Sequence, residues 1–128
     1  IYPVAHTYLP QLSDEILKLV EGIFYFDEKF ASLHNPWLLE GHEGEDVYHC
    51  FPGDTEDKSG QAPFLIVHAE RDSLRMSGEK WTRELREAGV SVDEFIEPGA
   101  LHGYLSIGPS NAEADHTFGL MARWIKAH

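Results

Sequence analysis

The chain has little positive charge, a single cysteine and no long apolar run. It carries 10 Lys and Arg against 22 Asp and Glu, a formal net charge of −12. Because binding to nucleic acids or anionic membranes depends on lysine and arginine, this balance argues against both partners. The lone Cys50 excludes an intramolecular disulfide. The sequence contains neither a run of roughly 20 apolar residues nor a signal-peptide layout, so we expect a cytoplasmic protein without a membrane span.

The length and the first residues suggest that the chain is part of a larger fold. With 128 residues, of which 42% are hydrophobic, it is one domain or part of one and has enough apolar side chains for a core. It lacks an initiator methionine, and Ile1–Val4 reads as the end of a buried strand that breaks at Pro3. Domains usually begin with polar, loose residues. We therefore expect that preceding residues were removed or exist as another polypeptide.

A short amphipathic helix and an aromatic-rich stretch begin the chain. Ser13 is a suitable N-cap, and a helix over residues 13–24 is predicted by apolar residues at helical spacing, namely Ile16, Leu19, Val20 and Ile23. Aromatic residues from Phe24 to Trp37, Phe26 among them, show no strand alternation. We interpret them as a second short helix and a loop ending at Asn35-Pro36. This stretch either forms a cap lining an apolar pocket or belongs to an ordinary core.

Residues 40–62 are rich in Gly, Asp, Glu, Pro and Ser and are predicted to form a loop. They include six side chains of types that bind metals: His42, Glu43, Glu45, Asp46, His49 and Cys50. Their spacing matches neither a His-Glu-x-x-His motif, a Cys-x-x-Cys motif nor a calcium loop. A solvated acidic loop explains them better, so we expect no metal and no cofactor.

From residue 63 the pattern changes to strand, helix and strand. The apolar run Phe64–Ala69 and the alternating run Val92–Glu97 predict neighbouring parallel strands, with the helix Ser77–Ala88 crossing between them. Ser77 is the expected N-cap of that helix and Gly89 its C-terminal stop. Its expected buried residues are Trp81, Leu85 and Ala88.

A last helix follows a loop after the second strand. It opens with Ser110–Glu113, whose serine and glutamate have the spacing of a capping box. The apolar residues that recur at helical spacing behind the box are Phe118, Met121, Ala122 and Ile125. We expect these four to be its buried stripe.

Two polar residues follow the two predicted strands. Asp72 comes just after the first strand and His102 just after the second. Because reactive groups collect beyond the carboxyl ends of parallel strands, we expect the two side chains to meet. A histidine held by a carboxylate can take the proton of a serine hydroxyl, which is otherwise a weak nucleophile. The pair therefore predicts two members of a nucleophile–His–Asp triad.

Residues 63–74, 78–90 and 99–104 together resemble the C-terminal portion of an α/β-hydrolase, most closely the hormone-sensitive-lipase-like esterase branch. The resemblance is specific over residues 63–105 and loose before them. It implies that Asp72 is the triad acid, His102 the triad base and Leu74 the apolar residue of the family's Asp-x-Leu pattern. The residues that we expect in a substrate pocket are Phe26, Trp37, Leu74 and Tyr104.

The family's nucleophile is missing from this sequence. Neither its Gly-x-Ser-x-Gly motif nor its oxyanion-hole glycines occur. The nearest imitation is Gly108-Pro-Ser110-Asn-Ala112, but it follows His102, whereas this fold places the serine before the acid. Ser110 is also explained as a helix cap, so we reject it as the nucleophile.

The sequence thus predicts an α/β protein that is the C-terminal half of an α/β-hydrolase. Residues 1–62 would form the segment before the acid strand, and residues 63–128 the unit carrying acid and base. The complete enzyme would be a serine hydrolase of a small carboxylic ester or related acyl compound. Its N-terminal half, as partner, would supply the serine and oxyanion hole, and this chain alone would be inactive.

Two other interpretations stay open at this point. The chain could belong to a non-catalytic protein of the same fold that binds a small apolar ligand, although such proteins commonly lose a triad member. It could also be a self-sufficient small α/β domain, in which case Ile1–Val4 would be a true strand start.

Overall fold

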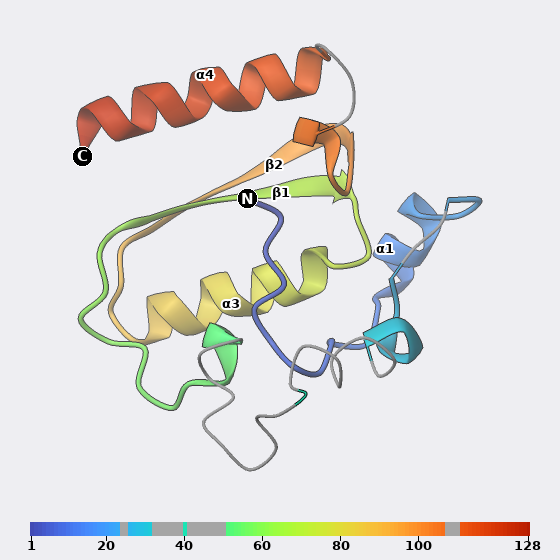
Figure 1. Cartoon of the computed structure of the whole chain (residues 1–128), viewed down its shortest axis with the longest axis horizontal. Coiled ribbons are helices and arrows are strands. Elements are labelled where there is room, and N and C mark those ends of the chain that lie inside the picture. Colours follow the sequence, from blue (N-terminus) through green and yellow to red (C-terminus); the bar gives the residue numbers. More distant parts are fainter. Residues whose placement is uncertain (24–25, 32–39, 41–50, 107–110) are drawn as a thin grey trace.

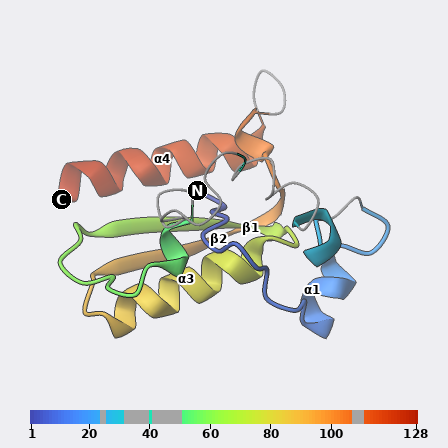
Figure 2. The same cartoon turned by 60° about the horizontal axis from the view of Figure 1, so that its bottom comes forward.

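The computed structural model describes residues 1–23, 26–31, 40, 51–106 and 111–128. Its helices and strands are, in chain order, α1 (Asp14–Leu19), β1 (Phe64–Arg71), α3 (Arg75–Glu87), β2 (Val92–Leu101) and α4 (Ala112–Ala127). Short 3-10 helices cover Pro52–Asp54 and Tyr104–Ser106. The two strands lie between α3 on one face and α4 on the other (Figure 1). Both views place α1 beyond the carboxyl end of β1 (Figure 2).

β1 and β2 pair in parallel, which confirms the predicted strand–helix–strand unit. Phe64 lies opposite Val92, and this register continues until Ala69 lies opposite Glu97. Arg71, however, lies opposite Leu101, so β2 contains two additional residues at this point. Pro98, which has no N–H, and Gly99, with a φ of 72°, belong to this irregular segment. The altered register sets the two strand ends side by side.

α3 packs on one face of the strands and begins earlier than predicted. Trp81 and Leu85 are buried as expected, in a cluster with Ala5, Ile66 and Val90, whereas Ala88 is only partly buried. Ser77 is not the N-cap, because the helix starts at Arg75 and Ser77 lies within it, fully buried. Gly89, with a φ of 80°, follows the last turn as predicted.

α4 packs on the other face, but not through the predicted stripe. Its buried residues are Ala114 and Thr117, whereas Phe118 is 52% and Ile125 66% exposed. A two-stranded sheet offers a helix only a narrow surface. α4 covers that surface with the face that carries Ala114 and Thr117, which lies beside the predicted stripe. The N-cap is Asn111, whose side chain accepts from the N–H of Ala114, and not Ser110 of the predicted capping box.

The first residues form no strand, so the expected strand end at Ile1–Val4 is wrong for this structure. The segment lies along β1 instead, where the Tyr2 N–H donates to the Val67 carbonyl at 2.6 Å. Ile1 and Val4 are partly exposed, and Ala5 and His6 are buried. The Ser13 cap is confirmed, but α1 ends at Leu19, before the predicted residue 24.

Several sequence-based predictions lie outside the described residues. These are the acidic cluster with its six potential metal ligands (His42 to Cys50), Trp37, the Asn35-Pro36 loop and Ser110. Of the expected second short helix, residues 28–31 are described and are helical. Within the described part, no helix combines the length and apolar character needed to cross a membrane.

A close contact between α3 and β1 depends on a glycine. A Cβ built on Gly78 would lie 2.8 Å from the ring of His68 and 3.3 Å from Pro3. His68 is fully buried, and its Nε2 hydrogen-bonds to Glu94 at 2.9 Å, so the ring has little room to move. Burial lowers the pKa of His68, more than the hydrogen bond and charge of Glu94 raise it.

We therefore predict that Gly78→Ala lowers the free energy of unfolding by about 1–3 kcal/mol through overpacking. The matched control is Gly119→Ala in α4, where the nearest atom is the end of the flexible Arg123 side chain at 3.4 Å. That change should raise stability by about 0.5–1 kcal/mol, because alanine is the better helix former. Urea unfolding of both variants checks this, and a stabilised Gly78→Ala would contradict the described packing.

Candidate active site

Asp72 and His102 are hydrogen-bonded to each other. The Nδ1 atom of His102 lies 2.8 Å from Oδ2 of Asp72. Asp72 directly follows β1 and His102 directly follows β2, and the altered register makes these two positions neighbours. Without the two additional residues in β2, Asp72 would lie opposite Ala100 instead. The predicted meeting of acid and imidazole is thus present, and the irregular segment Pro98–Ala100 accounts for it.

The Asp72 carboxylate is held rigidly at the start of α3. It is buried, and its Oδ1 accepts the N–H of Leu74 at 2.9 Å. This turn brings Asp72 to the N-terminal end of the 13-residue helix α3, where the helix dipole favours a negative charge. The same hydrogen bond explains why α3 starts at Arg75, two residues before the expected N-cap Ser77.

The His102 ring is oriented by its neighbours. A carboxylate only accepts hydrogen bonds, so Nδ1 carries the proton that it shares with Asp72, and a neutral ring has Nε2 unprotonated. The rings of Tyr2 and Phe26 meet the imidazole edge-on, with centroids at 4.9 and 5.3 Å. None of the described residues hydrogen-bonds to Nε2. The ring therefore presents a proton acceptor and is about one-third exposed.

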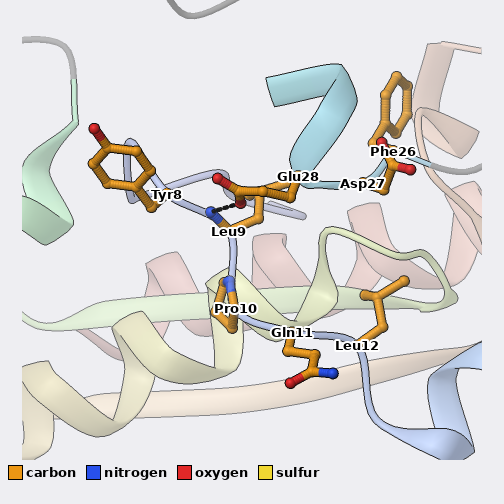
Figure 3. Close-up of a pocket in the computed structure, with 8 residues that line it drawn as sticks. All are labelled: Tyr8, Leu9, Pro10, Gln11, Leu12, Phe26, Asp27 and Glu28. Atoms are coloured by element: carbon orange, nitrogen blue, oxygen red, sulfur yellow. Dashed lines mark hydrogen bonds between the residues drawn. The ribbon is translucent and has the colours of Figure 1, made fainter. Parts of the chain in front are cut away.

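Two cavities meet at Phe26. The smaller, of about 190 Å³, contains the acid–base pair and is lined by Ile23, Phe26, Arg71, Asp72, Ser73, Leu101 and His102. The larger, of about 440 Å³, lies between residues 8–12 and residues 26–28 (Figure 3). In that cavity the N–H of Leu9 donates to Glu28 at 3.1 Å and ties the two segments together. Phe26 lines both.

The expected pocket residues have different positions. Phe26 lines the wall beside His102, as described above. Leu74 is buried and does not line the smaller cavity. Tyr104 does not line it either, because it is buried in a cluster with Ala114 of α4. Trp37 lies outside the described residues.

Other residues of the site were not singled out from the sequence. Ser73 accepts the N–H of Phe26 at 2.8 Å and so fixes the aromatic wall. Tyr2 has no assigned site role in the sequence analysis, yet its ring packs on His102. Both contacts join residues that are tens of positions apart, and local sequence patterns carry no signal for such contacts.

A second serine–histidine–carboxylate chain occurs elsewhere, between the N-terminal segment and α3. Ser77 Oγ lies 3.0 Å from Nδ1 of His6, whose Nε2 lies 2.9 Å from Glu84. Burial raises the pKa of Glu84, but the hydrogen bond and charge of His6 and nearby lysines outweigh it, so the pKa is lowered overall. Ser77 is fully buried and also accepts the N–H of Ala5 at 3.1 Å. Because no substrate can reach that hydroxyl, its role is to anchor the first residues to α3.

The fold and this geometry define an α/β protein with an acid–base pair at the carboxyl edge of a parallel sheet. A family model described as alpha/beta hydrolase fold matches residues 1–106. The chain belongs to the α/β-hydrolase fold family, which confirms the fold class and the resemblance found in the sequence.

The curated relatives are esterases of which this chain covers a small part. It is 33% identical over 70 residues to an ethyl acetate hydrolase of Pseudomonas putida, covering 55% of this chain and 22% of that protein. It is 42% identical over 66 residues to the carboxylesterase NlhH of Mycobacterium tuberculosis, covering 49% and 20%. The chain thus spans about a fifth of the length of these relatives.

Solved esterase structures share the arrangement of the chain. The esterase LipW of Mycobacterium marinum matches with a TM-score of 0.73 and 25% identity, over 93% of this chain and 36% of that one. The carboxyl esterase 2 of Tuber melanosporum matches with a TM-score of 0.65 and 22% identity, over 94% and 40%. The second likeness supports the fold alone.

The anchoring role of Ser77 predicts the effect of its removal. Ser77→Ala leaves the N–H of Ala5 and the ring of His6 without their buried partner, which should lower the free energy of unfolding by about 1–3 kcal/mol. Ser91→Ala, at an exposed position directly before β2, should change it by less than about 0.5 kcal/mol. Urea unfolding of the two variants measures the difference. Equal unfolding midpoints would show that the buried hydrogen bonds of Ser77 contribute nothing to stability.

Proposed function

We propose that this chain supplies the acid and the base of a Ser-His-Asp triad in an esterase. Asp72 is the acid, His102 the base, and the substrate is a small carboxylic ester. The observation that carries the proposal is the 2.8 Å hydrogen bond from His102 Nδ1 to Asp72, with Nε2 not bonded to any residue that the structure describes. The esterase relatives support the same reaction class.

In the proposed reaction, a serine hydroxyl attacks the ester carbonyl carbon while Nε2 of His102 takes its proton. The carboxylate of Asp72 stabilises the imidazolium that forms. His102 then gives the proton to the alkoxide leaving group as the C–O bond breaks, which yields an alcohol and an acyl-serine. Water, deprotonated by the same Nε2, then attacks the acyl-serine. His102 returns that proton to the serine oxygen as the acyl C–O bond breaks, which releases a carboxylic acid.

In this proposal, the nucleophilic serine and the oxyanion-hole donors belong to residues outside this sequence of 128 residues. The curated relatives are about five times longer than the matched stretch, which leaves room for them. The chain alone would therefore be inactive, and its partner would be the nucleophile-bearing half of the same hydrolase.

A non-catalytic ligand-binding protein is the competing function. A carboxylate that fixes one imidazole tautomer raises the rate of a general base by a large factor, whereas binding of a small apolar ligand does not depend on it. The retained pair of Asp72 and His102 therefore favours the hydrolase.

The two cavities suggest how an ester would lie. The reacting carbonyl has to come near Nε2 of His102 in the smaller cavity, which is too small for more than a short group. The larger cavity is mostly apolar and shares the wall formed by Phe26. We assign the longer apolar group of the ester to this larger cavity, since apolar pockets of this size hold small ligands.

Removing the base tests the proposal in the complete protein. His102→Ala should abolish nearly all hydrolysis of p-nitrophenyl acetate, because no other described group can take the serine proton. Asp72→Asn should lower kcat by up to roughly 10⁴-fold if it leaves the imidazole in the wrong tautomer. His128→Ala, which removes an exposed histidine after α4, is the matched control and should keep the parent rate within about twofold. Equal activity of His102→Ala and the parent would contradict the assigned role.

Filling the larger cavity tests the assigned substrate position. Leu9→Trp should leave kcat/KM for p-nitrophenyl acetate within about twofold of the parent value. For p-nitrophenyl hexanoate it should lower kcat/KM by about tenfold or more, because methylenes excluded from the cavity lose about 1–3 kcal/mol of binding free energy. Leu17→Trp, at an exposed position of α1, is the control. An equal change for both esters would show that the long group lies elsewhere.

A further inference from the structure

Glu97 is a buried carboxylate that the proposed reaction does not use. It belongs to β2 on the face covered by α4 and is only 4% exposed. Its oxygens accept from Thr117 Oγ1 at 2.8 Å and from His116 Nδ1 at 2.9 and 3.1 Å. Burying a carboxylate is unfavourable unless hydrogen bonds compensate it. Here they come from a single turn of α4.

The charge of Glu97 fixes the direction of the hydrogen bonds around it. Because a carboxylate only accepts, the Thr117 hydroxyl donates to it and keeps its lone pairs for another donor. That donor is the Tyr104 hydroxyl, 2.6 Å from Thr117 Oγ1. Burial raises the pKa of Tyr104, so its hydroxyl remains protonated at neutral pH. Tyr104, Thr117 and Glu97 thus form a directed chain, which we call the Tyr104 relay.

Tyr104 is fastened to α4 at both of its ends. Its hydroxyl is held by the relay, and its carbonyl accepts from the side-chain amide of Asn111 at 2.9 Å. Asn111 is itself the N-cap of α4. Both views show the segment after β2 beside the beginning of α4 (Figures 1 and 2). The loop that carries His102 is therefore clamped to this helix.

The clamp reaches His102 by two routes. Along the chain, only Gly103, with a φ of 78°, separates Tyr104 from His102. Through space, the Tyr2 ring contacts Tyr104 at 5.7 Å and His102 at 4.9 Å between centroids. Glycine is the least restrained residue, so it gives the loop no stiffness of its own. The stiffness has to come from the fixed tyrosine.

We propose that the Tyr104 relay holds the His102 imidazole in the geometry needed for proton transfer, which makes Glu97, Thr117 and Tyr104 positioning residues. This inference rests on the proposed function of His102. None of the three contacts the reacting atoms; they act through the loop and the Tyr2 ring. A base displaced by a fraction of an ångström loses rate while substrate binding is unchanged.

Two variants that each remove one hydroxyl test the relay in the complete protein. Tyr104→Phe keeps the packed ring, and Thr117→Val keeps the shape of the side chain. Each should lower kcat for p-nitrophenyl acetate by about tenfold, the effect of losing one hydrogen bond, with KM within about twofold. The double variant should lose no more than either single one, because both remove the same chain. The relay is refuted if both single variants have the parent kcat.

Two further variants separate positioning from stability. Thr82→Val removes a buried hydroxyl of α3 that has no hydrogen-bond partner among the described residues, and it should leave kcat within about twofold. Glu97→Gln keeps an acceptor for Thr117 and should restore most of the kcat that Glu97→Leu loses. The relay has no specific role if Glu97→Gln and Glu97→Leu have the same kcat. It also has none if Thr82→Val lowers kcat as much as Thr117→Val does.

A spectroscopic readout makes the inference independent of turnover. The proton shared by His102 Nδ1 and Asp72 should give a downfield NMR resonance in the complete protein, absent in His102→Ala. Tyr104→Phe and Thr117→Val should broaden it or speed its exchange with water at least about threefold, and Thr82→Val should not. An unchanged resonance in both relay variants overturns the inference. If the parent hydrolyses no ester but the resonance responds, the proposed function fails and the positioning role stands.

Discussion

The two additional residues of β2 are the constraint on which the site depends. Parallel pairing alone would set Asp72 opposite Ala100, and the irregular segment at Pro98–Ala100 moves His102 into that place. Pro98 removes a donor from the ladder, and the Gly99 N–H turns instead to Glu70, at 2.8 Å. A local departure from regular sheet geometry thus brings the acid and the imidazole within hydrogen-bond distance.

Buried polar groups on both faces of the sheet also hold Asp72 and the segments around His102 in place. On the α3 side, the turn from Asp72 to Leu74 fixes the carboxylate, and the buried contacts of Ser77 fix the segment that carries Tyr2. On the α4 side, the Tyr104 relay fixes the loop that follows His102. The two layers meet at the Tyr2 ring, which contacts His102 and Tyr104. Most of the buried polar side chains therefore hold parts of one site.

The sequence predicted those features that depend on local order along the chain. Asp72 and His102 could be found because each follows an apolar run, and parallel strands end at a common edge. The Ser77 cap was predicted wrongly because its hydroxyl is used by Ala5, 72 positions away, while Asp72 accepts the N–H of Leu74. Helical periodicity identified an apolar face of α4. Which face of the helix packs on the strands depends on the width of the sheet, and periodicity does not report that width. The relay from Glu97 joins three elements and leaves no periodic signal.

The central claim is that His102 serves a nucleophile located outside these 128 residues. A crystal structure of the complete protein after reaction with a fluorophosphonate tests it most directly. We expect a single modified serine outside this stretch, with its Oγ within about 3 Å of His102 Nε2 and the hydrogen bond between Nδ1 and Asp72 preserved. A modified Ser110 or Ser77, or a His102 ring turned away from the modified serine, would contradict it.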